Sequence, residues 1–307
     1  MRIILLFCFL GSFFDAFTQE RLDHFAPDFF EQQRFAHRGG YANGPENTIE
    51  TILYNINNGV GAIEIDVELT KDNQLVIFHD ATIERVLQTD EARSVQEMTL
   101  AEITAIPLRD ESQGKQYVAS FKSLIDTLTK LIPTKEIDFL LEIDFKPHGD
   151  AGIIGVDKLM EVLNEEVDNF GDGLYNYFFV STFYPDVLKL LREKDPLVKI
   201  ALGVNNTPDS SVLLARMAIL LSPMFIKNSG ASIIEPNMCM VTPRYVKKWH
   251  KRGVMINAYT ANTACEKENL EQFDIAYTTN CPTGTCIPDI SDQIGKPQKW
   301  CKGCATD

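Results

Sequence analysis

Three short stretches near the N-terminus combine apolar runs with side chains that can do acid–base and metal chemistry. His37 and Arg38 follow one apolar run, Glu64 and Asp66 lie within a second, and His79 ends a third. Imidazoles exchange protons near neutral pH, a guanidinium binds phosphate oxygens, and paired carboxylates hold divalent cations. These are the residue types that metal-assisted attack on a phosphate ester requires. The sequence therefore predicts a phosphoesterase site in this segment.

The spacing of the carboxylates predicts the direction in which they point. Acidic and apolar residues alternate in AIEIDVEL (62–69), so Glu64, Asp66 and Glu68 share one face of a strand. An acidic face that points into an apolar interior needs a compensating cation, and oxygen ligands favour a hard ion such as Mg²⁺ or Ca²⁺. A half-exposed strand whose acidic face meets water is the simpler alternative.

The positions of the histidines favour an α/β fold of the TIM type, a (β/α)8 barrel. RFAHRGG and QLVIFHD each carry a histidine at the C-terminal end of an apolar run, where such a barrel places its catalytic groups. Helices are expected after several strands, the first over 47–58 with Asn47 as its N-cap. The eight predicted barrel strands are RFAHRGG, AIEIDVEL, QLVIFHD, DFLLEIDFK, YFFVSTF, KIALGV, ASIIEPN and VMINAYT.

The chain is expected to contain one domain between two short terminal segments. Residues 1–18 have the pattern of a secretory signal peptide, with Arg2 before an apolar run and small residues near the end. That run is shorter than the roughly 20 residues of a membrane span, so a secreted or lumenal protein is favoured, with an uncleaved membrane anchor as the alternative. A barrel domain over 30–290 and a cysteine-containing tail over 291–307 follow.

Charge and cysteine content limit the partners and the compartment. A net charge of −14 argues against nucleic acid and against simple electrostatic binding to anionic lipid. Asn205 begins a glycosylation acceptor pattern. An even number of cysteines crowded toward the C-terminus indicates three disulfides and a disulfide-rich tail, although a zinc site or a redox pair is the alternative. These cysteines are Cys239, Cys265, Cys281, Cys286, Cys301 and Cys304.

Four linked motifs resemble those of the glycerophosphodiester phosphodiesterase family in order and spacing. They are HRGG at 37–40, PENT at 45–48, Glu64-x-Asp66 and the pair His79-Asp80. The similarity continues through most of the chain, in LLEIDFKP, YTAN and TTNCP. The branch that is most similar is the membrane-associated animal type that hydrolyses glycerophosphoinositol, which also carries Asp-x-Lys in the later acidic motif.

The resemblance implies roles for residues of the later motifs. Asp144 takes the place of a third metal-binding carboxylate, and Lys146 takes that of a lysine that contacts the phosphate. Tyr259 stands where the family usually has tryptophan and could form a wall for the glycerol moiety, while Asn280 replaces an aspartate. Glu142 is a further candidate metal ligand, because it shares a strand face with Asp144.

Together, the residues and the resemblance predict a metal-dependent hydrolase that cleaves glycerophosphodiesters to an alcohol and glycerol 3-phosphate. One of His37 and His79 is the base and the other the acid, while Arg38 binds the phosphate. The family implies a neighbouring glycerol hydroxyl as nucleophile and a cyclic phosphate that water opens. Two alternatives stay open, a phospholipase D-type enzyme acting on lysophospholipids or sphingolipids and a non-catalytic extracellular binding protein on a degenerate barrel.

Two later stretches carry predictions about surfaces. Residues 211–227 are apolar almost all round, which a barrel helix packed under a loop explains. The alternative is a peripheral membrane contact beside the substrate entrance, as the resembled branch suggests. Glu235 follows the apolar residues of the strand ASIIEPN and is expected at the rim of the cleft.

Overall fold

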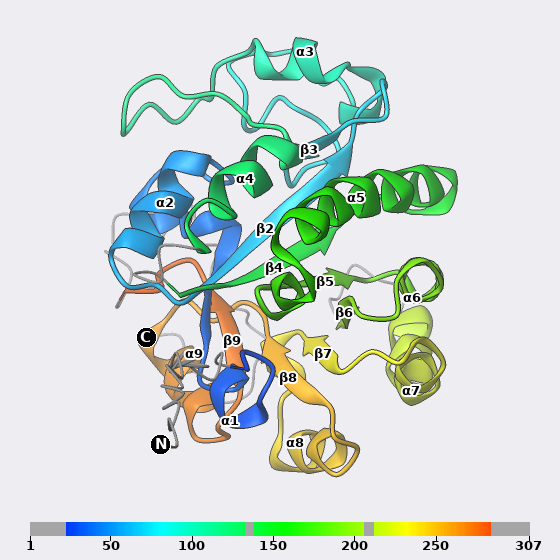
Figure 1. Ribbon diagram of the computed structural model, residues 1–307. Coiled ribbons are helices and arrows are strands. Elements are labelled where there is room, and N and C mark those ends of the chain that lie inside the picture. The colour runs from blue at the N-terminus through cyan, green and yellow to red at the C-terminus, as the bar shows by residue number, and fades with distance from the viewer. Residues whose placement is uncertain (1–22, 133–137, 206–211, 284–307) are drawn as a thin grey trace, which may run out of the picture.

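A computed structural model describes residues 23–132, 138–205 and 212–283, and Figure 1 shows that they form a barrel surrounded by helices. The strands belong to one sheet of nine. Their bounds are β1 (Arg34–Ala36), β2 (Ala62–Leu69), β3 (Leu75–Ile77), β4 (Leu140–Phe145), β5 (Phe178–Thr182), β6 (Lys199–Val204), β7 (Ile233–Pro236), β8 (Met255–Ala258) and β9 (Ala276–Thr279).

Eight parallel strands close the barrel, which confirms the predicted (β/α)8 fold. The order around the barrel is β1, β9, β8, β7, β6, β5, β4, β2, and β1 pairs with β2 to complete the circle. In the register of β2 with β4, Glu64 lies beside Glu142 and Asp66 lies beside Asp144. The two acidic strands predicted from the sequence are therefore neighbours, and their acidic faces are aligned residue by residue.

One of the eight predicted barrel strands is not part of the barrel, so that prediction is wrong. QLVIFHD forms β3, which runs antiparallel to β2, and the eighth barrel strand is β9. The turn between β2 and β3 is too short for the crossover that a parallel pair needs, so the chain can only fold back as a hairpin. His79 still reaches the catalytic end, because β3 returns along the C-terminal half of β2 and the amide of Phe78 donates to the Asp66 carbonyl at 3.0 Å.

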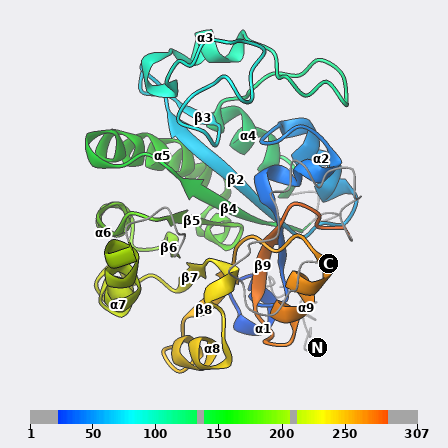
Figure 2. The same cartoon turned by 180° about the vertical axis from the view of Figure 1, so that it is seen from behind.

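Helices cover the outside of the barrel, as Figures 1 and 2 show from opposite sides. The segment between β3 and α4, which includes α3, forms an excursion above β2 (Figure 1). The helices are α1 (Pro27–Phe30), α2 (Ile49–Asn57), α3 (Leu100–Thr104), α4 (Phe121–Leu128), α5 (Gly149–Phe170), α6 (Pro185–Lys194), α7 (Val212–Ser229), α8 (Pro243–His250) and α9 (Ala264–Glu271).

Aromatic side chains close the N-terminal end of the barrel. Phe30 of α1 is completely buried, and its ring lies 5.7 Å from Phe35 and 5.8 Å from Phe179. His24 is also buried here and lies 2.8 Å from Asp138. This end is therefore packed, and the acidic side chains are confined to the middle and the C-terminal end.

Several predictions concern residues that the structure does not describe. The signal peptide, the tail over 291–307 and three of the predicted disulfide cysteines, Cys286, Cys301 and Cys304, lie outside the described residues and stay predictions. Cys239, Cys265 and Cys281 are disulfide-bonded. Within residues 23–132, 138–205 and 212–283, none of the helices has the length and apolar character needed to cross a membrane.

Candidate active site

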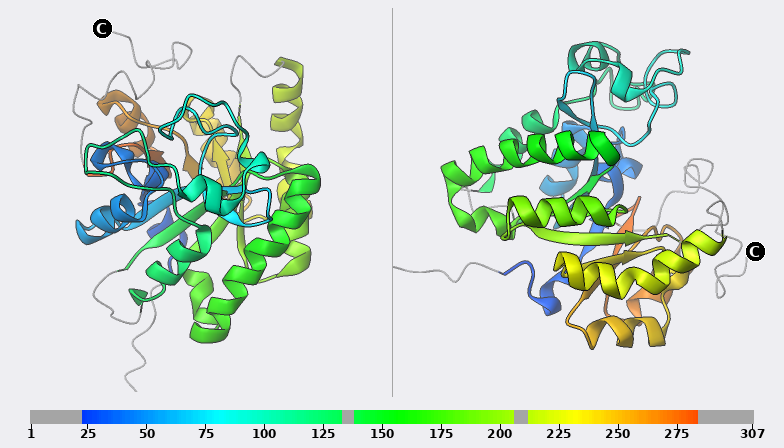
Figure 3. Two further views of the ribbon diagram at one scale, coloured as in Figure 1. Left: turned by 90° about the horizontal axis from the view of Figure 1, so that it is seen from above. Right: turned by 90° about the vertical axis from the view of Figure 1, so that its right-hand side faces the viewer.

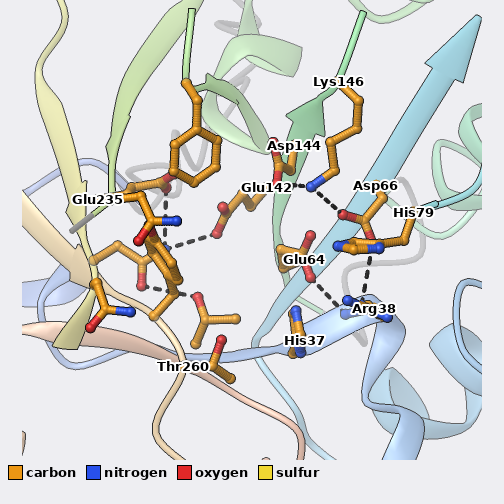
Figure 4. A pocket seen from close by; sticks show the side chains of 16 residues that line it. His37, Arg38, Glu64, Asp66, His79, Glu142, Asp144, Lys146, Glu235 and Thr260 are labelled. Carbon is orange, nitrogen blue, oxygen red and sulfur yellow. Dashed lines mark hydrogen bonds and ion pairs between the residues drawn. The ribbon is translucent and has the colours of Figure 1, made fainter. Parts of the chain in front are cut away.

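A cavity of about 400 Å³ lies inside the barrel and opens at its C-terminal end. Figure 4 shows how its side chains point toward one another from several strands. Every residue predicted for the site lines this cavity, namely His37, Arg38, Glu64, Asp66, His79, Glu142, Asp144, Lys146 and Tyr259. The parallel strands thus bring together residues that are far apart in the sequence, as the barrel prediction required.

Three carboxylates form a cluster that fits a divalent cation. Glu64, Asp66 and Asp144 each offer an oxygen, and these oxygens all lie within 4.8 Å of one another. The Oδ1 atom of Asp144 is buried and has no hydrogen-bond partner among the described residues. Burial, and then the nearby charge of Asp66, raise the pKa of Glu64 well above its ordinary value. A hard cation would relieve this repulsion and satisfy the unpaired oxygen.

Lys146 lies between two carboxylates of the cluster, as Figure 4 shows. Its Nζ atom is 2.8 Å from Asp66 Oδ1 and 2.5 Å from Asp144 Oδ2. Burial alone would lower the pKa of Lys146, but the charges of Asp144 and Asp66 raise it above its ordinary value. Likewise, burial alone would raise the pKa of Asp66, but Lys146 and other cations hold it below its ordinary range. Both side chains are therefore ionised at neutral pH.

Glu142 belongs to a second group of buried polar side chains beside the cluster. Ser181 donates to its Oε1 at 3.1 Å, and Asn257 donates to its Oε2 at 2.8 Å. Asn257 also lies 3.3 Å from Glu235 Oε1. Glu142 stays a candidate metal ligand, but its oxygens already accept hydrogen bonds. Glu235 is 4% exposed, so the expectation that it lies at the rim is wrong.

Two consecutive glycines shape the turn that carries the first histidine and the arginine. Arg38, Gly39 and Gly40 all have positive φ, at 53°, 80° and 87°. A Cβ atom would lie 2.8 Å from Ile52 Cγ1 if placed on Gly39, and 2.6 Å from Asn55 Nδ2 if placed on Gly40. Only glycine allows this turn to pack against α2, which explains the local sequence HRGG.

The turn fixes Arg38 at the edge of the carboxylate cluster. Its backbone N–H donates to Glu64 Oε2 at 2.6 Å, so the turn and β2 are tied directly. Its guanidinium donates to Glu46 Oε1 at 3.1 Å, and its Nε atom lies 3.7 Å from Asp66 Oδ2. The guanidinium therefore points into the cavity with its orientation set by Glu46.

His37 is held in one tautomer by an amide. Its Nδ1 lies 2.6 Å from Asn280 Oδ1, while the Asn280 Nδ2 donates to the Tyr41 hydroxyl at 2.7 Å. Because an amide oxygen only accepts, the proton of His37 sits on Nδ1 and leaves Nε2 able to take a proton. Burial, and then the charge of Arg38, lower the pKa of His37 to about 3. This histidine is neutral at neutral pH.

His79 has a different partner. Its Nδ1 lies 2.6 Å from the Asp80 carboxylate, and because a carboxylate only accepts, this contact favours a proton on Nδ1. The two candidate catalytic rings thus differ in the charge of the group behind them, since Asn280 is neutral and Asp80 is an anion. Sequence reasoning identified both histidines but did not separate their roles.

Asn47 orients the carboxylate of Asp66. The sequence analysis expected Asn47 to be the N-cap of the first helix instead. The N-cap of α2 is Thr48, whose side chain accepts from the Thr51 amide at 3.2 Å. Asn47 instead has a φ of 53° and donates to Asp66 Oδ2 at 2.8 Å, while its Oδ1 accepts from the Asp66 amide at 3.2 Å. Asn47 belongs to the PENT motif, and the resemblance of that motif to the family is the sequence signal that could have identified this contact.

An aromatic pair forms the opposite wall of the cavity. The hydroxyl of Tyr259 donates to the carbonyl of Val204 at 3.1 Å, and its ring meets Phe183 edge to face at 5.6 Å. Both rings line the cavity, together with the side chain of Asn205. The predicted aromatic wall at Tyr259 is therefore in place, although its substrate contact stays a prediction.

Fold and site together place the protein in the class of barrel hydrolases that act on phosphate esters. The model of the Glycerophosphoryl diester phosphodiesterase family matches residues 37–278, and the chain belongs to this family. The match extends beyond the four N-terminal motifs and includes Asp144, Lys146 and Tyr259.

Curated relatives and solved structures agree with this assignment. The chain is 28% identical over 274 residues to glycerophosphodiester phosphodiesterase 1 of Bos taurus, covering 83% of this chain and 80% of the relative. It is 28% identical over 272 residues to the Homo sapiens protein of that name, covering 82% and 79%. An Oleispira antarctica phosphodiesterase, solved in complex with the product sn-glycerol-3-phosphate, shares the fold with a TM-score of 0.67 and 19% identity, covering 82% of this chain and 94% of that one.

Proposed function

We propose that this protein hydrolyses glycerophosphodiesters to an alcohol and glycerol 3-phosphate with the help of one divalent cation. The observation that carries the proposal is the convergence of His37 and His79 on the cavity that holds the Glu64, Asp66 and Asp144 cluster. Membership of the family supports the substrate class. The intact site argues against the non-catalytic binding protein on a degenerate barrel.

Glu64, Asp66 and Asp144 would hold the cation, and we propose Mg²⁺ or Ca²⁺ because the donor set is all oxygen. Such a cation, when bound, supplies positive charge that polarises a phosphoryl oxygen. Arg38 and Lys146 bind the other non-bridging oxygens, because both cations point into the cavity beside the cluster. Their charges stabilise the negative charge that grows on the phosphate as the nucleophile attacks.

The unlike partners of the two histidines assign their roles in the proposed reaction. His37 is neutral with Nε2 unprotonated, so it removes the proton from the attacking hydroxyl as the new P–O bond forms. His79, backed by the Asp80 carboxylate, delivers a proton to the alcohol oxygen as the old P–O bond breaks. A neighbouring glycerol hydroxyl is the proposed nucleophile, and water then opens the cyclic phosphate.

A comparison of leaving groups tests these roles. Replacement of either histidine by alanine is expected to abolish cleavage of a glycerophosphodiester with an alkyl alcohol leaving group. With a p-nitrophenyl ester of glycerol phosphate, the leaving anion needs no proton, so His79→Ala should recover activity whereas His37→Ala should not. Recovery of the His37 variant alone would reverse the assignment. Near-normal turnover of the alkyl substrate by both variants would show that neither histidine is an essential acid or base, and absence of turnover by the wild-type protein would remove the hydrolase proposal.

A lysophospholipid is the second candidate substrate, because α7 exposes apolar side chains. Leu220 is 75% exposed, Met224 is 46% exposed and Leu221 is 37% exposed. We propose that this surface makes a peripheral membrane contact. Assays that compare soluble glycerophosphodiesters with lysolipids in vesicles separate the two substrates, and Leu220→Ser with Met224→Ser should reduce vesicle binding without changing turnover of the soluble substrate.

We also propose that the protein is exported, with residues 1–18 as its signal and its cysteines oxidised. Asn205 is the proposed glycosylation acceptor, and its side chain lines the cavity. Expression in a eukaryotic secretory host, followed by glycosidase treatment and mass spectrometry, tests cleavage of the signal, disulfide formation and glycan attachment at once. A glycan-free, uncleaved product retained in the cell would contradict this proposal.

A further inference from the structure

Arg85 holds two carboxylates with two adjacent edges of its guanidinium, which share Nη2. Nη1 and Nη2 donate to Glu46 Oε2 and Oε1, at 2.8 Å and 2.6 Å. Nε and Nη2 donate to Asp80 Oδ2 and Oδ1, at 2.5 Å and 3.0 Å. A planar guanidinium is suited to such paired contacts, which fix both carboxylates in orientation as well as in distance.

Each of these carboxylates also contacts a residue of the proposed catalytic machinery. Glu46 Oε1 lies 3.1 Å from Arg38 Nη1, and Asp80 Oδ1 lies 2.6 Å from His79 Nδ1. The oxygens that contact Arg38 and His79 are the same ones that accept from Arg85 Nη2. A continuous chain of alternating charges therefore runs from the phosphate-binding arginine to the second histidine.

We propose that Arg85 is a positioning residue that fixes the distance between Arg38 and His79. The inference rests on the proposed function, in which these two side chains act on one phosphodiester. Glu46 contacts Arg38 and Asp80 contacts His79, while Arg85 binds both carboxylates, so the geometry points to its guanidinium as the link.

The fold explains why such a link is needed. Glu64 and Asp66 are positioned by the register of the barrel strands, whereas His79 follows the antiparallel strand β3 and lies outside that register. Arg85 belongs to the excursion after β3, which lies over the barrel in the view from above (Figure 3, left). Its contact with Glu46 ties this excursion to the turn between β1 and α2.

Removal of the Arg85 guanidinium would leave two carboxylates near each other without their common cation. Glu46 and Asp80 are only 13% and 22% exposed, so water would screen their repulsion poorly. Each is then expected to turn away, and the orientation of Arg38 and of His79 is lost with it. Arg85 itself is 48% exposed, so a small cation from solution can enter the vacated position.

Kinetics of Arg85→Ala, Arg85→Lys and Arg93→Ala test the proposal. Arg93 is a matched control, because it is 40% exposed, pairs with Glu102 at 3.6 Å and lies in the same excursion. We expect Arg85→Ala to lower kcat on a glycerophosphodiester by about 100-fold, the cost of misplacing catalytic groups by an ångström. Arg85→Lys should keep the charge but lose the paired contacts, so its kcat should lie between those of the wild type and Arg85→Ala. Arg93→Ala should keep the wild-type kcat.

Rescue by guanidinium ion separates positioning from a merely structural role. Millimolar guanidinium, far below denaturing concentration, should restore part of the kcat of Arg85→Ala and leave the wild type and Arg93→Ala unchanged. A wild-type kcat for Arg85→Ala, or a loss that follows its thermal unfolding and is not rescued, would overturn the proposal. An inactive wild-type protein would instead indicate that the proposed function is wrong.

Discussion

Asp66 of β2 and Asp144 of β4 stand opposite each other in the strand register, and Lys146 binds both carboxylates at once. This arrangement brings a third carboxylate, Glu64, to the same point without any loop. The site therefore depends on the pairing of two barrel strands. A substitution in the cluster should change the chemistry of the site while the barrel stays folded.

We expect Asp144→Asn to lower kcat/KM by about 100-fold, because it removes one anionic ligand while keeping the shape of the side chain. The concentration of Mg²⁺ or Ca²⁺ that gives half-maximal activity should rise, and a chelator should abolish activity of the wild type. Glu68→Gln is the control, because Glu68 lies on β2 but outside the three-carboxylate group. Activity that persists in chelator and in Asp144→Asn would rule out a metal at this cluster.

The amide behind His37 predicts a shift in the pH dependence. In Asn280→Asp, a carboxylate would replace the neutral oxygen that lies 2.6 Å from His37 Nδ1. A neighbouring anion favours the imidazolium, so the pKa of His37 should rise by about 1 to 3 units. The base is active only when neutral, so the acid limb of kcat/KM against pH should move to higher pH. Asn280→Ala should lower kcat without raising this limb, and an unchanged limb in Asn280→Asp would contradict the role of His37 as base.

Packing of the glycine turn predicts a difference between two glycine substitutions. Gly40 and Gly59 have similar φ, at 87° and 84°, so alanine is strained at both. A Cβ on Gly40 would meet the Asn55 side chain at 2.6 Å, whereas a Cβ on Gly59 would meet nothing within 4 Å. We expect Gly59→Ala to cost about 1 kcal/mol and Gly40→Ala about 1 to 3 kcal/mol more. Urea unfolding measures the loss of stability in both variants. Equal losses would show that the Asn55 side chain moves away from the added Cβ without cost.

Much of the site follows from the sequence because the alternation of a strand sets the direction of its side chains. That rule predicted the shared acidic face of β2 and the matching face of β4. The turn before β3 is also too short for a parallel crossover, which needs a dozen residues or more. Its length in the sequence therefore already argued against QLVIFHD as a barrel strand.

Other features could not be predicted from local pattern. Arg85 stands alone in the sequence, and only the folded excursion brings it between Glu46 and Asp80. The depth of Glu235 was also misjudged, because alternation shows that a side chain points inward but not how far the strand end lies from solvent. Likewise, Asn47 has the residue type of an N-cap, and only its backbone conformation reveals its contact with Asp66.

The buried pair of Glu142 and Glu235 predicts how stability depends on pH. Burial, and then the charge of Asp144, raise the pKa of Glu235 from an ordinary value of 4.5 to about 8. The folded state therefore binds this proton more tightly than the unfolded chain, and its contribution to stability is lost as pH rises from 4.5 through 8. Glu235→Gln keeps the hydrogen bond with Asn257 possible and cannot ionise. We expect the variant to gain about 1 kcal/mol or more over the wild type between pH 5 and pH 8.

Thermal unfolding in chelator at these two pH values measures the gain, because chelator removes any stabilisation by bound metal. Glu161→Gln serves as the control, since Glu161 is 65% exposed and pairs only with Lys158 among the described residues. The control should follow the pH dependence of the wild type. A Glu235→Gln protein that loses stability between pH 5 and pH 8 as steeply as the wild type would show that another group carries the proton, with Glu142 as the first to replace.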